Sequence, residues 1–436
     1  MKIEYGIHFY INICNYSQII EYEENSTGKL NHCIHLLNTF FTSVERYSAK
    51  YKKIEIEKIT GSRLHLYAVG DIDEVVDDVL DVICYAYSFS LEVNRISKYK
   101  TLPSIKINAG ASYGKFITHN IELSDNKTEF TSIGYACNYA AKLQNIAKSN
   151  YLCLDDEIYN EIKYKVQCEK LYNAKFKKKY NQDYYYSLAI DKLNNNEYGD
   201  FIDIQIKNFN SNSLGDMEFT NTNSRFGFDN LSLNSGKKFD GIPVYADVRD
   251  FTSKFDEDDE NLIEMAYRVI ELLKTMYNIV DKCSGTHVQF QGDREFAVFV
   301  MDKNNVILKN VIIAGLRMID AIDKTTIFSL GIGAVEGKLH ATTIGIRNNK
   351  DNILLGKAVN EANYAEDELA EKKELVISDD IFEKLNVIDK KLASIFKMKA
   401  RGYYYTTLGY SHYRNIVEKE ELIQSTKNKL YNGAWS

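Results

Sequence analysis

The sequence lacks the features that mark nucleic-acid-binding, secreted and membrane-spanning proteins. Its formal net charge is -7 at pH 7, whereas a nucleic-acid-binding surface is normally basic. The first residues do not contain the basic start, apolar core and small-residue cleavage site of a secretory signal. No apolar run is long enough to cross a bilayer. We therefore expect a cytoplasmic protein without nucleic-acid or membrane partners.

Cysteine is also sparse and scattered. The chain has 7 cysteines, without a C-x-x-C pair or a nearby histidine cluster of the kind that binds structural zinc. We therefore expect buried, reduced thiols rather than disulfides or a zinc site.

Length and composition favour two ordinary globular domains. A chain of 436 residues is long for one compact domain and sufficient for two, each with its own core. The hydrophobic content of 44% and the charged content of 26% are typical of soluble globular proteins. Disorder is therefore not expected over most of the chain.

An internal repeat of domain length organises the chain. Five pairs of similar segments occur in the same order in the two halves. They are residues 9–17 and 244–252, 56–66 and 286–296, 110–115 and 333–338, 134–140 and 356–362, and 152–156 and 376–380. Because the order is kept throughout, we predict that the halves are two copies of one α+β domain.

The local patterns within each copy agree as well. The first segment of each pair is β-prone and is followed by a stretch with apolar residues at three- and four-residue steps, around residues 30–44 and 262–277, which is typical of an amphipathic helix. In the second pair, two strand-like runs meet at Gly61 and at Gly292, as in a β-hairpin.

These boundaries divide the chain into four parts. We predict domains at residues 1–190 and 239–410, joined by an Asn-, Ser- and Gly-rich linker at 191–238 without sustained periodicity. Residues 411–436 form a polar tail with a helical composition outside the repeat.

Two carboxylates of the second half are suited to a metal site. Asp247 ends a β-prone run and Asp293 follows the hairpin glycine. If the two strands are neighbours, their oxygens converge as ligands for Mg²⁺ or Mn²⁺. Taken singly, each aspartate is as well explained by a role in capping a turn.

At these residues the sequence resembles the class III adenylate and guanylate cyclases. The resemblance rests on residues 245–252 and 291–293, which are similar to the two metal motifs, on the glycine-rich strand at 331–337, and on 356–360, which resembles the segment with the transition-state asparagine. It implies two ferredoxin-like (βαββαβ) domains that fold against each other. In this family, one partner supplies metal-binding carboxylates and the other supplies base-reading and transition-state residues.

The resemblance implies that the halves have specialised. Asn12 and Ser62 stand at the positions of Asp247 and Asp293, so the first half lacks the charge that a divalent ion requires. We therefore expect two Mg²⁺ or Mn²⁺ ions on Asp247 and Asp293 only.

The first half keeps the complementary residues of the family. Lys58 and Thr131 match the two base-selecting positions, and this pair accompanies adenine in many bacterial members. An ammonium group suits adenine N1, and a hydroxyl accepts from the exocyclic amine. Without the resemblance, Lys58 is explained as an exposed strand lysine and Thr131 as an ordinary β-former.

Asn138 matches the transition-state asparagine, and Lys142 stands where the family usually has arginine. Lysine still brings positive charge to the phosphorane, but it lacks the two-pronged geometry of guanidinium. This departure concerns the rate of turnover more than binding.

The remaining predicted residues concern a second site and the triphosphate. Gln289, Ile353 and Tyr364 occupy the corresponding positions of the second half, so a second site is expected to be silent. The resemblance also implies a triphosphate-contacting lysine, for which we favour Lys175 or Lys177, although a basic run is more often a solvated loop.

The expected function is conversion of ATP to cyclic AMP and pyrophosphate by a monomer, because fusion keeps the two domains at high effective concentration. Two alternatives remain open. The same fold can act on another nucleotide, GTP or a pyrimidine nucleotide, or the chain can be a weakly catalytic nucleotide sensor.

Overall fold

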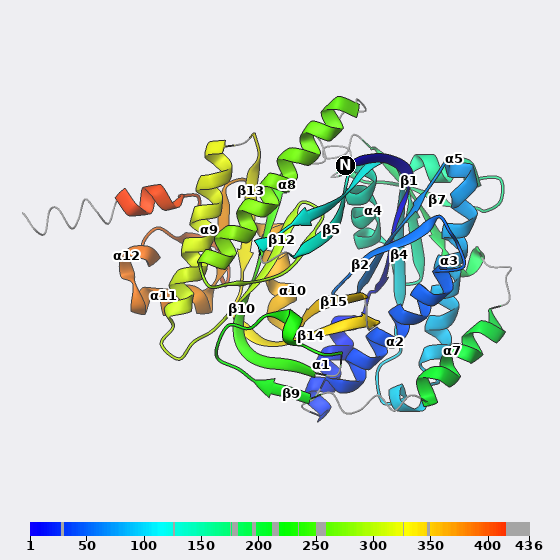
Figure 1. Ribbon diagram of the computed structural model, residues 1–436, viewed down its shortest axis with the longest axis horizontal. Coiled ribbons are helices and arrows are strands. Elements are labelled where there is room, and N and C mark those ends of the chain that lie inside the picture. Colours follow the sequence, from blue (N-terminus) through cyan, green and yellow to red (C-terminus); the bar gives the residue numbers. More distant parts are fainter. Residues whose placement is uncertain are drawn as a thin grey trace, which may run out of the picture.

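A computed structural model gives the fold of most of the chain. It describes residues 1–27, 30–124, 127–174, 176, 182–193, 198–233 except 212–217, 235–249, 259–325, 327–346 and 349–415. These residues form two β-sheets flanked by helices, one sheet in each half of the chain (Figure 1).

The first half contains one eight-stranded sheet. Its principal elements are β1 (Lys2–Ile13), α1 (Tyr16–Thr27), α2 (Asn31–Ser48), β2 (Ile54–Thr60), β3 (Arg63–Val69), α3 (Ile72–Val93), β4 (Ile107–Glu122), β5 (Thr128–Ile133), α4 (Tyr135–Ile146), β6 (Tyr151–Leu154), α5 (Asp156–Ile162), β7 (Glu169–Tyr172) and β8 (Tyr184–Ala189).

The second half repeats this order with a ten-stranded sheet. Its principal elements are β10 (Ser235–Arg249), α8 (Asp259–Lys282), β11 (Thr286–Gln291), β12 (Arg294–Val300), α9 (Val306–Thr325), β13 (Ser329–Ala334), β14 (Gly337–Ile346), β15 (Asn349–Leu355), α10 (Lys357–Tyr364), β16 (Glu374–Ser378), α11 (Asp379–Ile388), α12 (Lys390–Ala393), β17 (Lys397–Ala400) and β18 (Tyr403–Thr406).

The two sheets have the same topology, which confirms the predicted α+β fold. The strand order is β2-β3-β1-β4-β6-β8-β7 in the first sheet and β11-β12-β10-β13-β16-β18-β17 in the second. Registers also correspond, because Asn12 lies opposite Arg63 and Asp247 lies opposite Arg294. Equivalent positions can therefore be compared residue by residue.

Strand alternation decides which residues reach the site. Ile7, Phe9 and Ile11 of β1 are buried in the same core as α2 and α3. Because successive side chains of a strand point to opposite faces, the intervening positions of β1 and β10, including Asn12 and Asp247, face the side of the sheet that carries α4 or α10.

The predicted hairpins are present in both halves. Gly61 joins β2 to β3 with φ +62°, and Gly292 joins β11 to β12 with φ +68°. Glycine adopts this left-handed conformation without steric cost. Each turn places the following residue, Ser62 or Asp293, at the mouth of the cleft described below.

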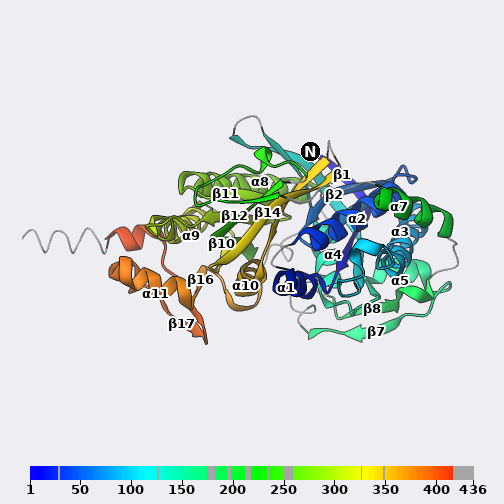
Figure 2. The ribbon, with the colours of Figure 1, turned by 90° about the horizontal axis from the view of Figure 1, so that it is seen from below.

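Each half inserts an antiparallel arm into the core of the other. Ile353 and Leu355 of β15 belong to the core of the first half, and Ile117 and Ile133 of the β4–β5 arm belong to the core of the second. In Figure 1 the β14–β15 arm reaches α2 and the β5 strand lies towards α8. The two halves are therefore interlocked; Figure 2 shows them side by side with α10 next to α1.

The segment predicted as a linker contains regular structure. Helix α7 (Gly199–Ser211) packs beside α3, with Ile202 and Phe209 buried in the first core. Strand β9 (Glu218–Asn221) pairs in parallel with the beginning of β10, which starts at Ser235 inside the same segment. The connection thus covers the outside of the first half before it enters the second sheet.

The described part of the tail ends on the second half. The backbone N–H and the hydroxyl of Ser411 both donate to Asp320 on α9, at 2.6 and 2.5 Å. All seven cysteines are unpaired. None of the helices in the described ranges is both long enough and apolar enough to cross a membrane.

Candidate functional site

A cleft of about 320 Å³ lies where the two halves meet, a volume at the lower end of small-molecule sites. Both halves contribute to its walls. The lining residues that matter below are Asn12, Lys58, Ser62, Asn138 and Lys142 of the first half, and Asp247, Gln289, Asp293, Arg294 and Asp367 of the second.

The two candidate metal ligands lie on neighbouring strands of the second sheet. Asp247 is opposite Arg294 in the β10–β12 register, and Asp293 directly precedes that arginine. The side chain of Asp247 is 14% exposed, and Asp293 is buried to 8% exposure. The strand pairing thus brings the two carboxylates to the same end of the sheet.

Two arginines and a buried glutamate accompany Asp247. Its carboxylate lies 3.4 Å from Arg249 and 3.7 Å from Arg294. Both guanidinium groups also contact Glu366, at 2.7 and 2.5 Å. Glu366 is on a π-helical turn, Ala365–Leu369, that extends α10, and π-helical turns are frequent at functional sites. Burial raises the pKa of Glu366 to about 7 despite the two arginines.

The same place in the first half is neutral. Ser62 donates to Asn12 Oδ1 at 2.8 Å, and Asn12 donates to Asn108 at 3.1 Å. Gln144, the counterpart of Glu366, donates to Asn108 at 3.0 Å. These amide and hydroxyl groups hydrogen-bond to one another, although the side-chain carbonyl of Gln144 has no partner among the described residues, and they carry no charge for a divalent cation.

The candidate transition-state residues of the first half face the acidic hairpin of the second. A Cβ built on Gly292 would lie 3.2 Å from Oδ1 of Asn138. One turn further along α4, Lys142 forms an ion pair with Asp367 of the second half at 3.0 Å. Asn138 thus lies across the domain boundary from the Gly292 hairpin, and Lys142 reaches across it to Asp367.

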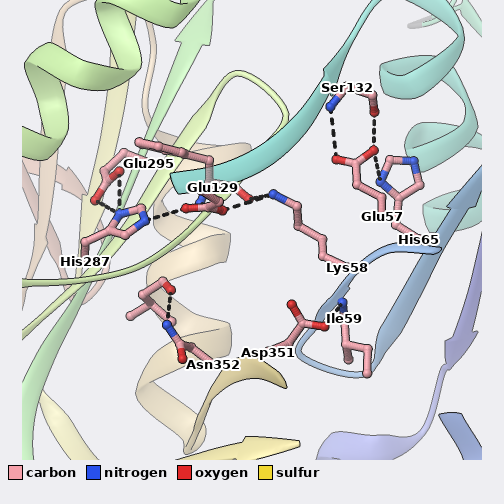
Figure 3. Close-up of polar contacts among 12 residues, drawn as sticks. Glu57, Lys58, Ile59, His65, Glu129, Ser132, His287, Glu295, Asp351 and Asn352 are labelled. Atoms are coloured by element: carbon pink, nitrogen blue, oxygen red, sulfur yellow. Dashed lines mark hydrogen bonds and ion pairs between the residues drawn. The ribbon is translucent and has the colours of Figure 1, made fainter. Parts of the chain in front are cut away.

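Lys58 is buried at the boundary rather than exposed on a strand (Figure 3). Its Nζ donates to Glu129 Oε1 and to the backbone carbonyl of Phe290, both at 3.0 Å. Burial opposes its charge, but the neighbouring carboxylates, Glu129 foremost, outweigh this and raise the pKa of Lys58. Lys58 is therefore charged and held within 3.0 Å of the second half.

Glu129 continues this network to His287 of β11. His287 Nε2 lies 2.7 Å from Glu129, and its Nδ1 lies 2.9 Å from Glu295 (Figure 3). Burial opposes the protonated ring, but the charges and hydrogen bonds of Glu295 and Glu129 raise the pKa of His287 to about 10. Burial raises the pKa of Glu295 to about 7. A buried chain of ionisable side chains, from Lys58 through Glu129 and His287 to Glu295, therefore joins the halves.

A related contact lies at the symmetry-equivalent place. Glu129 accepts from the backbone N–H of Phe290 at 2.8 Å, and Asp351 of β15 accepts from the N–H of Ile59 at 2.9 Å (Figure 3). Each arm thus places one carboxylate on the bulged strand of the other half. Burial raises the pKa of Asp351 to about 7.

Thr131 is fully buried beside this network. Among the described residues its hydroxyl has no hydrogen-bond partner, and neither does the side-chain carbonyl of Gln289. A buried polar atom without a partner is unfavourable by about 1–3 kcal/mol. Gln289 lines the cleft and is suited to a ligand that supplies a hydrogen-bond donor, whereas Thr131 does not line the cleft, so its hydroxyl reaches a ligand only if the domain boundary opens.

The remaining predicted residues are placed as follows. Ile353 is buried in the first core and Tyr364 is exposed near Tyr403, so neither lines the cleft. Lys175 and Lys177 lie outside the described residues, as do residues 250–252 of the first metal motif.

Several residues of the site were not anticipated from the sequence. Glu366 and Asp367 come from a π-helical turn, which no periodicity reveals. Glu129 carries one signal, since it stands two positions before Thr131 on the same strand and therefore on the same face. His287 and Glu295 face each other only because β11 and β12 pair.

The comparisons with known proteins agree with this architecture. Residues 237–410 match the family described as adenylate and guanylate cyclase catalytic domain. The structure is similar to a class III adenylyl cyclase-like ATP-binding protein from Pseudomonas aeruginosa, with a TM-score of 0.73 and 16% identity, over 95% of this chain and 90% of that one. No curated protein matches the chain in sequence.

Individual catalytic domains also match parts of the chain. The adenylyl cyclase CyaB from P. aeruginosa matches with a TM-score of 0.33 and 17% identity, over 39% of this chain and 94% of that one. The guanylate cyclase domain of RhGC from Catenaria anguillulae, in complex with GTP, matches with a TM-score of 0.34 and 21% identity, over 43% and 99%.

Proposed function

We propose that the chain is a tandem member of the class III nucleotidyl cyclase family, whose catalytic-domain model matches residues 237–410, and that its halves share one site that converts ATP to cyclic AMP and pyrophosphate. One observation carries the proposal: Asp247 and Asp293 of the second half line the same cleft as Asn138 and Lys142 of the first. Neither half has both pairs, so the proposed site is complete only in the full chain.

The donor set of the second half fits Mg²⁺ or Mn²⁺. Asp247 and Asp293 offer carboxylate oxygens at one end of the sheet, whereas Asn12 and Ser62 are occupied with each other. When bound there, two divalent ions would stabilise the attacking ribose oxyanion and neutralise phosphate charge. In the absence of such ions, the two arginines beside Asp247 balance the negative charge of its carboxylate.

The side chains across the boundary act on the ribose and the α-phosphate. Asn138 donates a hydrogen bond that orients the ribose, and Lys142 places positive charge against the phosphate that expands during attack by the 3′ oxygen. Lys142 has to leave Asp367 to do so. A triphosphate carries more negative charge than one carboxylate and therefore competes for this lysine.

Two contacts favour adenine. An ammonium group has three donors, and Lys58 uses two of them on Glu129 and Phe290, which leaves one for adenine N1. The hydroxyl of Thr131, without a partner among the described residues, accepts from the exocyclic amine. GTP and UTP do not offer this combination of groups, whereas cytosine does, with N3 as the acceptor and its N4 amine as the donor.

A second candidate is a nucleotide sensor with weak catalysis. It is favoured by the ion pairs that hold Lys142 to Asp367 and Asp247 to two arginines, and by the ATP-binding protein whose fold the chain shares over most of its length. A sensor binds ATP without releasing pyrophosphate.

Substitution of Asp367 by asparagine separates the two candidates. The Lys142–Asp367 pair is about one-quarter exposed, so its loss is worth at most about 1 kcal/mol. For a cyclase we expect Asp367→Asn to raise kcat roughly two- to fivefold, because Lys142 is released. The matched control is Glu368→Gln, on the exposed side of the same turn. A sensor with weak catalysis binds ATP in each of these variants and keeps a negligible kcat.

The direct test is product analysis. The purified chain is incubated separately with ATP, GTP, CTP and UTP and Mn²⁺, and the products are identified by mass spectrometry. We expect cyclic AMP and pyrophosphate from ATP. A different cyclic nucleotide as the main product overturns the base assignment, and tight ATP binding without any cyclic product leaves the sensor as the function.

A further inference from the structure

A chain of buried polar side chains runs through the first half behind the cleft. His65 Nδ1 lies 3.1 Å from Glu57, and His65 Nε2 lies 2.9 Å from His8 Nδ1. His8 Nε2 lies 3.3 Å from the thiol of Cys137. At the other end, Glu57 accepts from the backbone N–H and the hydroxyl of Ser132. The side chains of all five residues are buried.

Each contact of this chain can be assigned one hydrogen-bond donor and one acceptor. Burial alone would raise the pKa of Glu57, but the charge and hydrogen bond of His65 lower it to about 2, so Glu57 is ionised. Burial, and then the charge of His65, lowers the pKa of His8 well below its usual range. A neutral His8 donates from one ring nitrogen and accepts at the other, so each contact has one donor and one acceptor.

The fold does not require these polar groups. The equivalent positions of the second half are apolar: they are Pro243, Val288, Phe296, Leu354 and Val359. The correspondence is exact in register, because β2 and β11 carry the same bulge, at Glu57 and at Val288. Burying polar groups is unfavourable compared with a packed apolar core, so the first half keeps them for another reason.

The members of the chain are sequence neighbours of the proposed substrate contacts. Glu57 precedes Lys58 on β2. Ser132 follows Thr131 on β5. Cys137 precedes Asn138 on α4. In the second half, where the corresponding site is silent, these links are missing.

We propose that the chain Cys137–His8–His65–Glu57–Ser132 positions the three substrate contacts Lys58, Thr131 and Asn138 relative to one another. This inference rests on the proposed function. Its residues contact no substrate; they act through the backbone of their neighbours. A hydrogen-bonded chain suits this role because its bonds are directional, whereas an apolar core tolerates small shifts.

A metal site is the alternative explanation for three of these residues. His8, Glu57 and His65 form a cluster of metal-ligand type in the described part of the chain. Two nitrogens on one tetrahedral zinc ion lie about 3.3 Å apart, given bonds of about 2.0–2.1 Å. The ring nitrogens of His8 and His65 are 2.9 Å apart, and Glu57 contacts the far nitrogen of His65. These distances fit hydrogen bonds.

Two single substitutions test the two ends of the chain. Glu57→Gln removes the ionised end next to Lys58 and Ser132. We expect it to reduce the ratio of kcat/KM for ATP over GTP by about tenfold, as expected for one lost base contact. Cys137→Val introduces the residue type of the second half next to Asn138. We expect it to lower kcat for ATP several-fold and to leave the ATP to GTP ratio unchanged.

A matched control variant and a variant with four apolar substitutions extend this test. Cys153→Val removes another buried thiol of the first half, outside the chain, and should leave both parameters unchanged. The combination Glu57→Val, His65→Phe, His8→Val and Cys137→Val replaces four of the five polar groups by apolar residues, three of which are those of the second half. It should keep the melting temperature of the parent within a few degrees and lose both kcat and base preference. If it does not fold, the single substitutions decide.

The outcomes are distinct. A parent that forms a cyclic nucleotide while folded variants keep its kcat and its base ratio overturns the positioning role alone. A parent that neither binds nor cyclises a nucleotide overturns the proposed function, and this inference with it. Stoichiometric zinc in the purified parent, measured by mass spectrometry and lost in Glu57→Gln, overturns the hydrogen-bonded chain in favour of a metal site.

Discussion

Asp247 and Asp293 share their strand positions with Asn12 and Ser62 of the first half, and this pairing yields a prediction with an internal control. We expect Asp247→Asn and Asp293→Asn each to lower Mn²⁺-dependent kcat/KM by about a hundredfold or more, because one ligand charge of the metal site is lost. Asn12→Ala and Ser62→Ala should remain within a few-fold of the parent, since the hydrogen bonds of these side chains to described residues, Ser62 to Asn12 and Asn12 to Asn108, lie within the first half.

Initial rates at several Mn²⁺ concentrations check this asymmetry. Binding of a non-hydrolysable ATP analogue shows whether each variant is folded around the cleft. Equal losses in all four variants contradict the assignment of one live and one silent site.

The carboxylate of Glu129 changes the expected effect of substituting Lys58. From the sequence, Lys58→Glu is expected to shift preference from ATP towards GTP, because a carboxylate accepts from the N1–H and amine of guanine. In the structure that carboxylate faces Glu129, which is 3.0 Å from Lys58 Nζ. Two buried like charges at this distance are unfavourable, so the single variant is expected to be destabilised.

The charge-swapped variant Lys58→Glu/Glu129→Lys provides the cleaner test. It keeps one positive and one negative charge at the boundary, and we expect it to recover most of the melting temperature lost by Lys58→Glu. If Lys58 reads the base, the double variant changes the ATP to GTP ratio of kcat/KM by roughly tenfold. A stable double variant with the ratio of the parent leaves Lys58 with a purely structural role.

At the scale of elements, β11 and the β4–β5 arm are joined by His287, and this contact predicts a pH dependence. The folded-state pKa of about 10 lies above the ordinary value of 6.5. The protonated ring therefore stabilises the fold fully below about pH 6.5, and this contribution is lost as the pH rises through about 10.

The melting temperatures of the parent and of His287→Gln, measured between pH 6 and 10.5, isolate this contribution. We expect the variant to melt roughly 4 °C lower near neutral pH, and the difference to shrink towards pH 10. Tyr277→Phe, beside the same ring, is the control for altered packing. A difference that stays constant with pH contradicts a charged His287.

The elements that the sequence predicts are those whose signal is local. The hairpins at Gly61 and Gly292 and the helices α2 and α8 follow from turn chemistry and period. Helix α7 was missed because the buried Ile202 and Phe209 and the partly buried Ile206 form only two turns of pattern within an Asn-rich segment. The π-helical turn that carries Glu366 leaves no periodic trace.

At the scale of the whole molecule, the interlocked arms are the feature that the sequence does not reveal. Ile117 and Ile353 read as ordinary strand residues, and nothing local indicates that each packs in the core of the opposite half. The repeat identifies two copies of one domain, but the exchange depends on contacts between residues far apart in the chain. The composite cleft follows from this exchange.

Separation of the halves therefore affects folding as well as chemistry. Chains of residues 1–234 and 235–436 divide the motif sets, so neither is expected to cyclise ATP alone. Each also exposes an apolar arm and the groove that receives the other arm, and such surfaces associate non-specifically. We expect both fragments to aggregate when they are expressed singly and to form a soluble 1:1 complex when they are coexpressed.

The activity of the coexpressed complex tests whether the two halves share one site. We expect the coexpressed pair to recover a substantial part of the parent turnover, because the arms re-form the boundary that carries Lys58, Glu129 and His287. Fragments purified separately and then mixed should recover much less, since each must fold with its arm unpaired. Size-exclusion chromatography and cyclic nucleotide assays on the same samples measure both. Turnover by residues 235–436 alone would exclude a shared site, because that fragment contains neither Asn138 nor Lys142.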